Sequence, residues 1–134
     1  MEKIIYHLVD ACNSHDAEGV AALYSEDYVG QDVAESHLQY GQPGIRHSVG
    51  LYLSAFPDVK LTAEEIIRQD GRAALVWSAR GTHLGPLLNI PATGRLVVIR
   101  GVSVLTIVNN KISRALYVWD LAGLLRELAL LPEL

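Results

Sequence analysis

The sequence predicts an α+β protein whose sheet is antiparallel. Up to Pro57, apolar residues recur three and four positions apart, which is the spacing of one face of a helix. Beyond Pro57 they alternate with polar residues, as in strands, and the dipeptides Asp70-Gly71 and Asn109-Asn110 are signals for tight hairpin turns. Helices followed by hairpin-linked strands are the pattern of the α+β class.

Three helices are expected in the first part of the chain. The first covers residues 2–12, and Asp16 then has the side chain of an N-cap, which accepts hydrogen bonds from unpaired backbone N–H groups. The second helix is predicted to carry Tyr24 on its apolar face. The third ends at Pro57, because proline lacks a backbone N–H and clashes with the preceding turn. Residues 34–44 are expected to form a loop.

Strands are expected at five places. They are residues 27–33, 59–69, 72–83, 96–108 and 111–119, and a short helix follows at 121–128. The strands that include Ala73 and Leu96 are apolar on both faces. One face must pack on the helices, and the other must meet a cavity, a partner subunit or both. A sheet enclosed wholly within its own core is an equal alternative.

Composition excludes several classes of function. A chain of 134 residues has the size of one domain, so residues 1–134 are expected to form a single one. The net charge is -4 and the basic residues are scattered, which excludes a nucleic-acid surface. No apolar stretch is long enough to span a membrane. Cys12 is the only cysteine, so a reduced, cytoplasmic setting is expected, and the five histidines show no metal-ligand spacing.

Five short segments carry a resemblance to a known family. They are Phe56-Pro57-Asp58, Gly81-Thr82-His83-Leu84-Gly85, Ile90-Pro91-Ala92-Thr93-Gly94-Arg95, Lys111-Ile112 and Trp119-Asp120. With these segments in order, the chain resembles the SnoaL-like polyketide cyclase (ester cyclase) family from Asp27 to Leu128. The resemblance implies a nuclear transport factor 2-like, cystatin-like fold: a cone-shaped, curved antiparallel sheet wrapped by N-terminal helices around an apolar pocket. It also implies a homodimer joined through the sheet, a hydrophobic small-molecule ligand or substrate, and no metal or organic cofactor.

The resemblance also implies a general acid/base. In the family, the aspartate that closes the last strand removes a proton next to a carbonyl in an intramolecular aldol cyclisation, and Asp120 matches it. The position after an apolar strand predicts partial desolvation of this carboxylate, which would make it a stronger base. The alternative is that Asp120 caps the final helix. His83 could position Asp120 or relay a proton, or it could hold the loop that follows it.

Pairing across the Asn109-Asn110 turn predicts which side chains surround Asp120. Two-residue closure sets Leu105 opposite Arg114 and Ser103 opposite Leu116, and opposed residues share a face. Ser103, Arg114 and Leu116 should therefore lie beside Asp120 in the pocket, unless a bulge resets the register.

Four aromatic residues are candidates for the pocket wall or for plain core. They are Tyr24, Tyr28, Phe56 and Trp77, and Trp119 is a further candidate for binding the substrate. Arg114 and Leu116 depart from the Glu and Trp that many family members carry, which leaves the reaction open. A cofactor-independent acid/base enzyme acting on a carbonyl compound is the leading hypothesis. The alternatives are an epoxide hydrolase or isomerase-like enzyme, a non-catalytic small-molecule-binding protein of the same fold, and a protein-interaction module.

Overall fold

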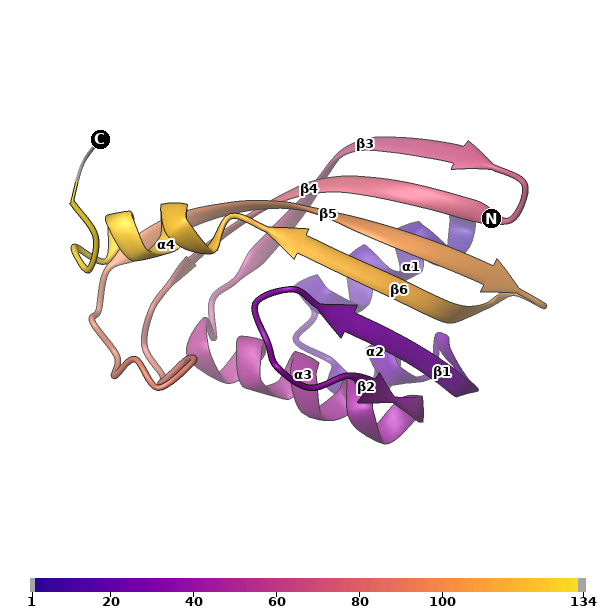
Figure 1. Cartoon of the computed structure of the whole chain (residues 1–134), viewed down its shortest axis with the longest axis horizontal. Coiled ribbons are helices and arrows are strands. Elements are labelled where there is room, and N and C mark those ends of the chain that lie inside the picture. Colours follow the sequence, from indigo (N-terminus) through magenta and orange to yellow (C-terminus); the bar gives the residue numbers. More distant parts are fainter. Residues whose placement is uncertain (1, 133–134) are drawn as a thin grey trace.

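A computed structural model describes residues 2–132 of the chain (Figure 1). Its helices are α1 (Glu2–Asn13), α2 (Ala17–Ala21), α3 (Gly41–Ala55) and α4 (Leu121–Glu127). Its strands are β1 (Tyr24–Asp32), β2 (Gln39–Tyr40), β3 (Lys60–Gln69), β4 (Arg72–Thr82), β5 (Leu96–Val108) and β6 (Lys111–Trp119). The predicted α+β class is confirmed.

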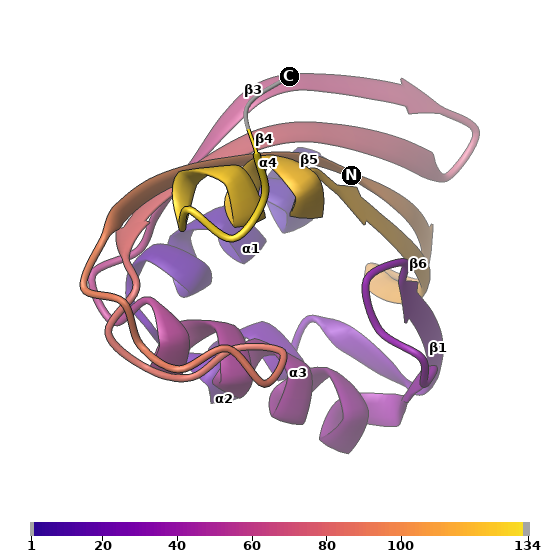
Figure 2. The same ribbon diagram turned by 60° about the vertical axis from the view of Figure 1, so that its left-hand side comes forward.

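The six strands form one curved, unclosed sheet in the order β2-β1-β6-β5-β4-β3. Neighbouring strands are antiparallel except β1 and β6, which run parallel, so the sheet is mixed rather than purely antiparallel. In Figure 2 the sheet arches over the helices, which lie on its concave side, and among residues 2–132 no helix covers its convex face. The helices therefore pack against the concave face of the sheet.

Local signals located most of the elements. Asp70 and Gly71 have positive φ values of 50° and 77°, and Asn109 and Asn110 have values of 51° and 61°, as a two-residue hairpin turn requires. Asp16 caps α2, since its side chain accepts a hydrogen bond of 2.9 Å from the Gly19 N–H. The predicted bounds of β5 and β6 agree with the structure.

Two predictions of local structure are wrong. Tyr24 does not belong to the second helix; α2 ends at Ala21 and Tyr24 begins β1. Its aromatic side chain suits a half-buried strand, where it is almost wholly buried. The expected loop over residues 34–44 also contains β2, whose backbone pairs with Val29 and Gly30 of β1. The first turn of α3 lies in the same segment.

The register between β5 and β6 is shifted by one bulge. Ile107 lies opposite Ile112 as predicted, but Thr106 then pairs with Arg114, so Ser113 is the extra residue. Side chains alternate between the two faces of a strand, so one inserted residue reverses which residues face inward. Beyond the bulge, Ser103 is opposite Tyr117.

Buried side chains form two clusters on the concave side of the sheet. The larger one joins α1, α2 and the middle of the sheet, and includes Ile5, Leu75, Leu105 and Ile112. The smaller one joins the end of α3, the loop after β4, and α4. The two clusters contact the same partly buried Trp77, so the space between them is bounded by side chains of both.

Truncating the larger cluster should destabilise the fold. Leu105 has no exposed surface, so Leu105→Ala should lower the free energy of unfolding by about 2–5 kcal/mol through lost burial and the cavity left behind. Urea denaturation followed by circular dichroism measures the change. Leu51 on α3 is 42% exposed, so Leu51→Ala should change the free energy of unfolding by less than about 1 kcal/mol. Equal losses in both variants would contradict this assignment of the core.

Candidate functional site

A cavity of about 200 Å³, partly open to solvent, lies between the sheet and the helices. An enclosed cavity of roughly 150 Å³ is enough to hold benzene, so this one has room for at least one ring. Its wall is mostly apolar, with side chains from α1, α2, α3 and all six strands. Among the residues that line it in the described chain, Asp32 is the one carboxylate, and no lysine, arginine or histidine occurs.

Asp32 is the last residue of β1 and is only 4% exposed. Its Oδ1 accepts hydrogen bonds from the Ala34 N–H at 2.9 Å and from the indole N–H of Trp119 at 2.8 Å. Its Oδ2 accepts one from the hydroxyl of Tyr52 at 2.7 Å. A carboxylate offers about four acceptor positions, so one on Oδ2 is left after these three bonds, and the side chain of Glu35 lies within hydrogen-bond reach of Asp32. The buried carboxylate is thus held by protein groups on both of its oxygens.

Tyr52 and Trp119 are held against each other beside this carboxylate. Their ring centroids are 6.0 Å apart and the rings are nearly perpendicular, an edge-to-face contact that fixes both side chains. Burial, and then the hydrogen bond to Asp32, raise the pKa of Tyr52 far above its ordinary value. Tyr52 therefore stays a neutral phenol that keeps its proton directed at Asp32.

A second carboxyl group, Glu35, lies just outside the cavity. Its Oε2 is 3.5 Å from the hydroxyl of Ser48, and its side chain is partly exposed. Burial raises the pKa of Glu35 above 4.5, and the nearby charge of Asp32 raises it further. Two acidic groups at close range resist being charged together, so proton occupancy of Glu35 depends on Asp32.

Three tyrosines form a second polar group in the wall. The hydroxyls of Tyr24 and Tyr117 are 2.6 Å apart, and the Tyr28 hydroxyl donates to Oε1 of Gln39 at 2.7 Å. Gln39 in turn donates from Nε2 to the hydroxyl of Ser48 at 2.9 Å. Burial raises the pKa of Tyr28 to about 12 and those of Tyr24 and Tyr117 well above 10. All three remain neutral phenols near neutral pH.

Two glycines make room for these aromatic groups. A Cβ on Gly30 would overlap the hydroxyl of Tyr28, so only glycine leaves space for that phenol between β1 and β2. A Cβ on Gly101 would collide with the indole ring of Trp77 and with Cβ of Trp119. Close packing of both tryptophans on β5 therefore depends on Gly101.

Five of the predicted substrate-binding residues line the cavity. They are Tyr24, Phe56, Trp77, Ser103 and Trp119. Ser103 accepts a hydrogen bond of 3.1 Å from the indole N–H of Trp77, so its own hydroxyl proton is left for another acceptor. The inward direction predicted for Ser103 is confirmed.

Arg114 and Leu116 do not face the cavity, and their predicted direction is wrong. The bulge at Ser113 turns both side chains to the convex face, where Leu116 is 38% exposed. Arg114 donates hydrogen bonds to the backbone oxygens of Asp27 and Ser113 at the surface. Tyr117 takes the inward place predicted for Leu116.

The predicted desolvation of Asp120 is also wrong. Its side chain is exposed and accepts a hydrogen bond of 2.8 Å from the Gly123 N–H, so it caps α4. It does not line the cavity, because the bulge sets Trp119 inward and leaves the next residue outside the last paired position. The alternative prediction, that Asp120 caps the final helix, is confirmed.

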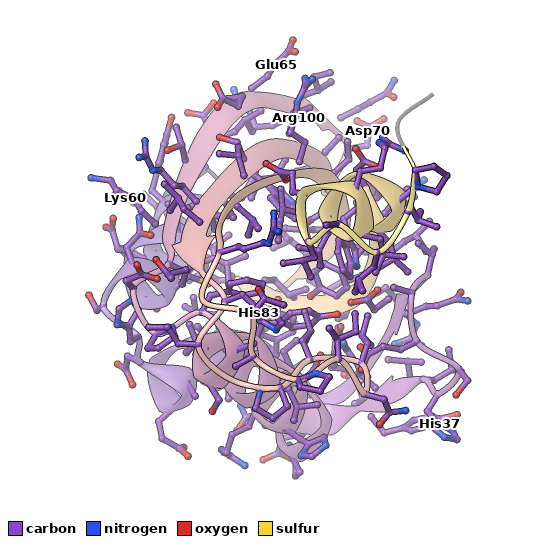
Figure 3. The ribbon with its side chains drawn as sticks, turned by 90° about the vertical axis from the view of Figure 1, so that its left-hand side faces the viewer. His37, Lys60, Glu65, Asp70, His83 and Arg100 are labelled. Carbon is purple, nitrogen blue, oxygen red and sulfur yellow. The ribbon has the colours of Figure 1, made fainter. Side chains whose placement is uncertain are left out.

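His83 is fully buried but is not one of the residues that line the cavity. Figure 3 shows it beside the loop that follows β4. Its Nδ1 is 3.0 Å from the hydroxyl of Thr93, and its ring contacts that of Phe56 at a centroid distance of 5.6 Å. Its backbone N–H donates to the carbonyl oxygen of Arg95, and its carbonyl oxygen accepts from the Gly94 N–H. These contacts hold both ends of the loop after β4, and they do not bring His83 to Asp120.

Sequence reasoning missed Asp32 and Tyr52. Tyr28, Gly30 and Asp32 alternate along β1, so Asp32 shares a face with Tyr28, which was a candidate for the core or the pocket wall. Tyr52 lies seven residues after Ile45 on α3, which places it on the same face of that helix. Both signals were present, but a polar residue at the end of a strand is normally interpreted as part of a turn.

A comparison with models of protein families gives a match over nearly the whole chain. A sequence model described as SnoaL-like polyketide cyclase matches residues 3–128. A search of curated proteins finds no match. Among the described residues, 2–132, no helix is long and apolar enough to cross a membrane.

Solved structures share the fold over nearly the whole chain. AclR, a proposed hydroxylase from Streptomyces galilaeus, is 26% identical with a TM-score of 0.86, covering 99% of this chain and 87% of AclR. TsrD from Streptomyces laurentii is 23% identical with a TM-score of 0.86, covering 97% of this chain and 95% of TsrD. IdmH, a proposed polyketide cyclase from Streptomyces antibioticus, is 23% identical with a TM-score of 0.82, covering 96% of this chain and 97% of IdmH.

The raised pKa of Glu35 predicts a pH dependence of stability. The folded protein binds the Glu35 proton more tightly than the unfolded chain, so above about pH 4.5 this group lowers stability as pH rises through its folded pKa. Glu35→Gln removes this ionisation. The melting temperature of Glu35→Gln, relative to that of the native chain, should therefore rise as the pH is raised from acid to neutral. Thermal denaturation over a pH series measures it, and a difference that is independent of pH would contradict the assignment.

Proposed function

Since the chain belongs to the SnoaL-like polyketide cyclase family, we propose that it is a cofactor-independent acid/base enzyme acting on a hydrophobic, carbonyl-bearing small molecule. One observation carries the proposal: among the described residues that line the mostly apolar cavity, Asp32 has the one buried carboxylate, and its Oδ2 keeps an acceptor position beyond the bond from Tyr52. A positioned base near a carbon acid is the requirement for proton abstraction next to a carbonyl.

The proposed step is proton transfer from carbon to Asp32. Oδ2 takes a proton from the carbon beside the substrate carbonyl, and the electrons of that C–H bond move to the carbonyl oxygen to form an enolate. In a cyclisation, the enolate carbon attacks a second carbonyl of the same molecule, and the alkoxide formed takes a proton back from the acid. In an isomerisation, the proton returns to another carbon of the enolate. Both outcomes use the same base.

Asp32 replaces Asp120 as the proposed acid/base. The Asp120 carboxylate is exposed and caps α4, whereas Asp32 is buried in the cavity wall. Covalent catalysis by Cys12, which also lines the cavity, is disfavoured because burial raises the pKa of its thiol to about 11. Ser103 keeps a hydroxyl proton for the substrate, and Trp77, Phe56 and Trp119 form the apolar wall.

A second candidate function is a non-catalytic small-molecule-binding protein. It is favoured by the three hydrogen bonds that Asp32 accepts, since these also suit a purely structural carboxylate that joins β1, α3 and β6. We propose a cytoplasmic setting for either function, in agreement with the free thiol of Cys12.

The acid/base proposal predicts hydrogen exchange at carbon. In D₂O, the native chain should accelerate deuterium incorporation next to the carbonyl of 2-tetralone, a small two-ring ketone, as followed by NMR. Asp32→Asn should lower the rate by at least about a hundredfold, the usual contribution of a positioned base. The matched control is Asp120→Asn, which should keep the rate because asparagine also caps helices.

The outcomes separate the candidates. A full rate in Asp32→Asn together with a loss in Asp120→Asn would assign the base to Asp120 and contradict our choice. Binding of 2-tetralone by the native chain without any exchange would favour the non-catalytic protein.

We also propose a homodimer joined through the convex face of the sheet. Two cross-strand rows of apolar side chains occupy it: Ile67, Ala74, Val104 and Leu116 in one, and Val76, Val102 and Val118 in the other. No described element covers these rows, and Leu116 and Val118 are 38% and 45% exposed. A continuous apolar patch of this kind is typical of an interface.

Charge placed in this patch should dissociate the dimer. Leu116→Glu would bury a carboxylate without a partner in the interface, so it should elute as a monomer in size-exclusion chromatography with light scattering, with an unchanged circular dichroism spectrum. Leu51→Glu on α3, on the other side of the molecule from the patch, should remain dimeric. A native chain that is monomeric at all concentrations would contradict the proposal.

A further inference from the structure

The tyrosine group in the cavity wall has one more proton than it has acceptors. Three hydroxyls, those of Tyr24, Tyr28 and Tyr117, bring three protons. The Tyr28 proton is directed at Oε1 of Gln39, 2.7 Å away. A second proton lies between the oxygens of Tyr24 and Tyr117, which are 2.6 Å apart and can exchange donor and acceptor roles.

The third proton has no short acceptor among residues 2–132. The nearest hydroxyl partner is the Tyr28 oxygen, which is 3.4 Å from that of Tyr117. Hydrogen bonds between hydroxyls are normally 2.5 to 3.0 Å long, so this contact is weak. If Tyr24 donates to Tyr117, the spare proton is on Tyr117; if Tyr117 donates, it is on Tyr24. Both residues line the cavity, whereas Tyr28 does not.

We propose that the hydroxyls of Tyr24 and Tyr117 form an oxygen-binding site in the cavity, which donates the spare proton to a carbonyl or enolate oxygen of the ligand. The inference rests on the proposed function and adds an oxygen-binding site to it. Asp32 and Tyr117 are paired residues on the neighbouring strands β1 and β6, and both line the cavity.

The chemistry of these donors also predicts which ligands the site binds poorly. The phenols are neutral, and no lysine, arginine or histidine lines the cavity in the described chain. A ligand phosphate or carboxylate would have to bury its full charge without a cation, which is costly. An enolate forms inside the cavity with its charge spread over carbon and oxygen, and a preorganised donor at the oxygen stabilises it as it develops. The substrate class is therefore a neutral hydrophobic ketone or β-dicarbonyl compound.

The test uses 2-tetralone labelled with ¹³C at the carbonyl carbon. When the native chain binds it, the carbonyl resonance should move downfield of its position in an apolar solvent, because hydrogen bonding withdraws electrons from the carbonyl. In Tyr24→Phe/Tyr117→Phe the resonance should return toward the apolar value, and the dissociation constant should rise about tenfold, as expected for a lost hydrogen bond of roughly 1.4 kcal/mol. Each single variant should keep most of the displacement, since the remaining hydroxyl keeps a proton.

Other outcomes would overturn the inference, and they are separable from a failure of the acid/base proposal. Asp32→Asn should lose exchange yet keep the carbonyl displacement, so the two proposals have different readouts. A native chain that does not bind the probe, or that binds it without a downfield displacement, overturns the oxygen site. So does a double variant with native affinity and displacement. Loss of the displacement in Ser103→Ala would assign the ligand oxygen to that hydroxyl instead.

Discussion

The extra residue at Ser113 determines the chemistry of the cavity. Because it is inserted into β6 opposite an uninterrupted β5, every later side chain of β6 is turned to the other face. Tyr117 and Trp119 point inward as a result, and each reaches a partner there: Tyr117 meets Tyr24, and Trp119 meets Asp32. Without the bulge, a leucine and an arginine would occupy the inner face of the strand. The polar groups of the cavity therefore depend on one irregularity at the surface end of a hairpin.

Asp32 connects this strand to the rest of the molecule. Its two oxygens accept hydrogen bonds from β6 and from α3, so a single buried carboxylate links the sheet to the helix that covers it. Removing one partner of such a group leaves a buried charge poorly satisfied, which is more costly than the gain from an added hydrogen bond. Stability and the proposed chemistry thus depend on the same side chain. A carboxylate with only a structural role needs no further acceptor position, whereas a base needs the one left on Oδ2.

The sequence was informative where structure is decided locally. Turn residues at Asp70-Gly71 and Asn109-Asn110 located the hairpins, and apolar periodicity located α1, α3 and the long strands. The bulge had no comparable signal, since Ser113 is an ordinary strand residue, and with it the predicted direction of Arg114 was lost. The site depends on contacts between distant positions: the partners of Asp32 are 20 and 87 residues away along the chain. Family resemblance supplied the fold, and it directed attention to the aspartate one residue after Trp119 rather than to the carboxylate that Trp119 holds.

Gly101 has a consequence for how the width of the cavity can change. It does not line the cavity, but the Trp77 and Trp119 side chains that do so are packed against the space where its Cβ would be. A methyl group there would have to displace an indole into the hollow or force the two strands to shift. Relatives that differ at this position would thus accept ligands of different thickness while presenting identical contacting residues. Comparing wall residues alone would miss that origin of selectivity.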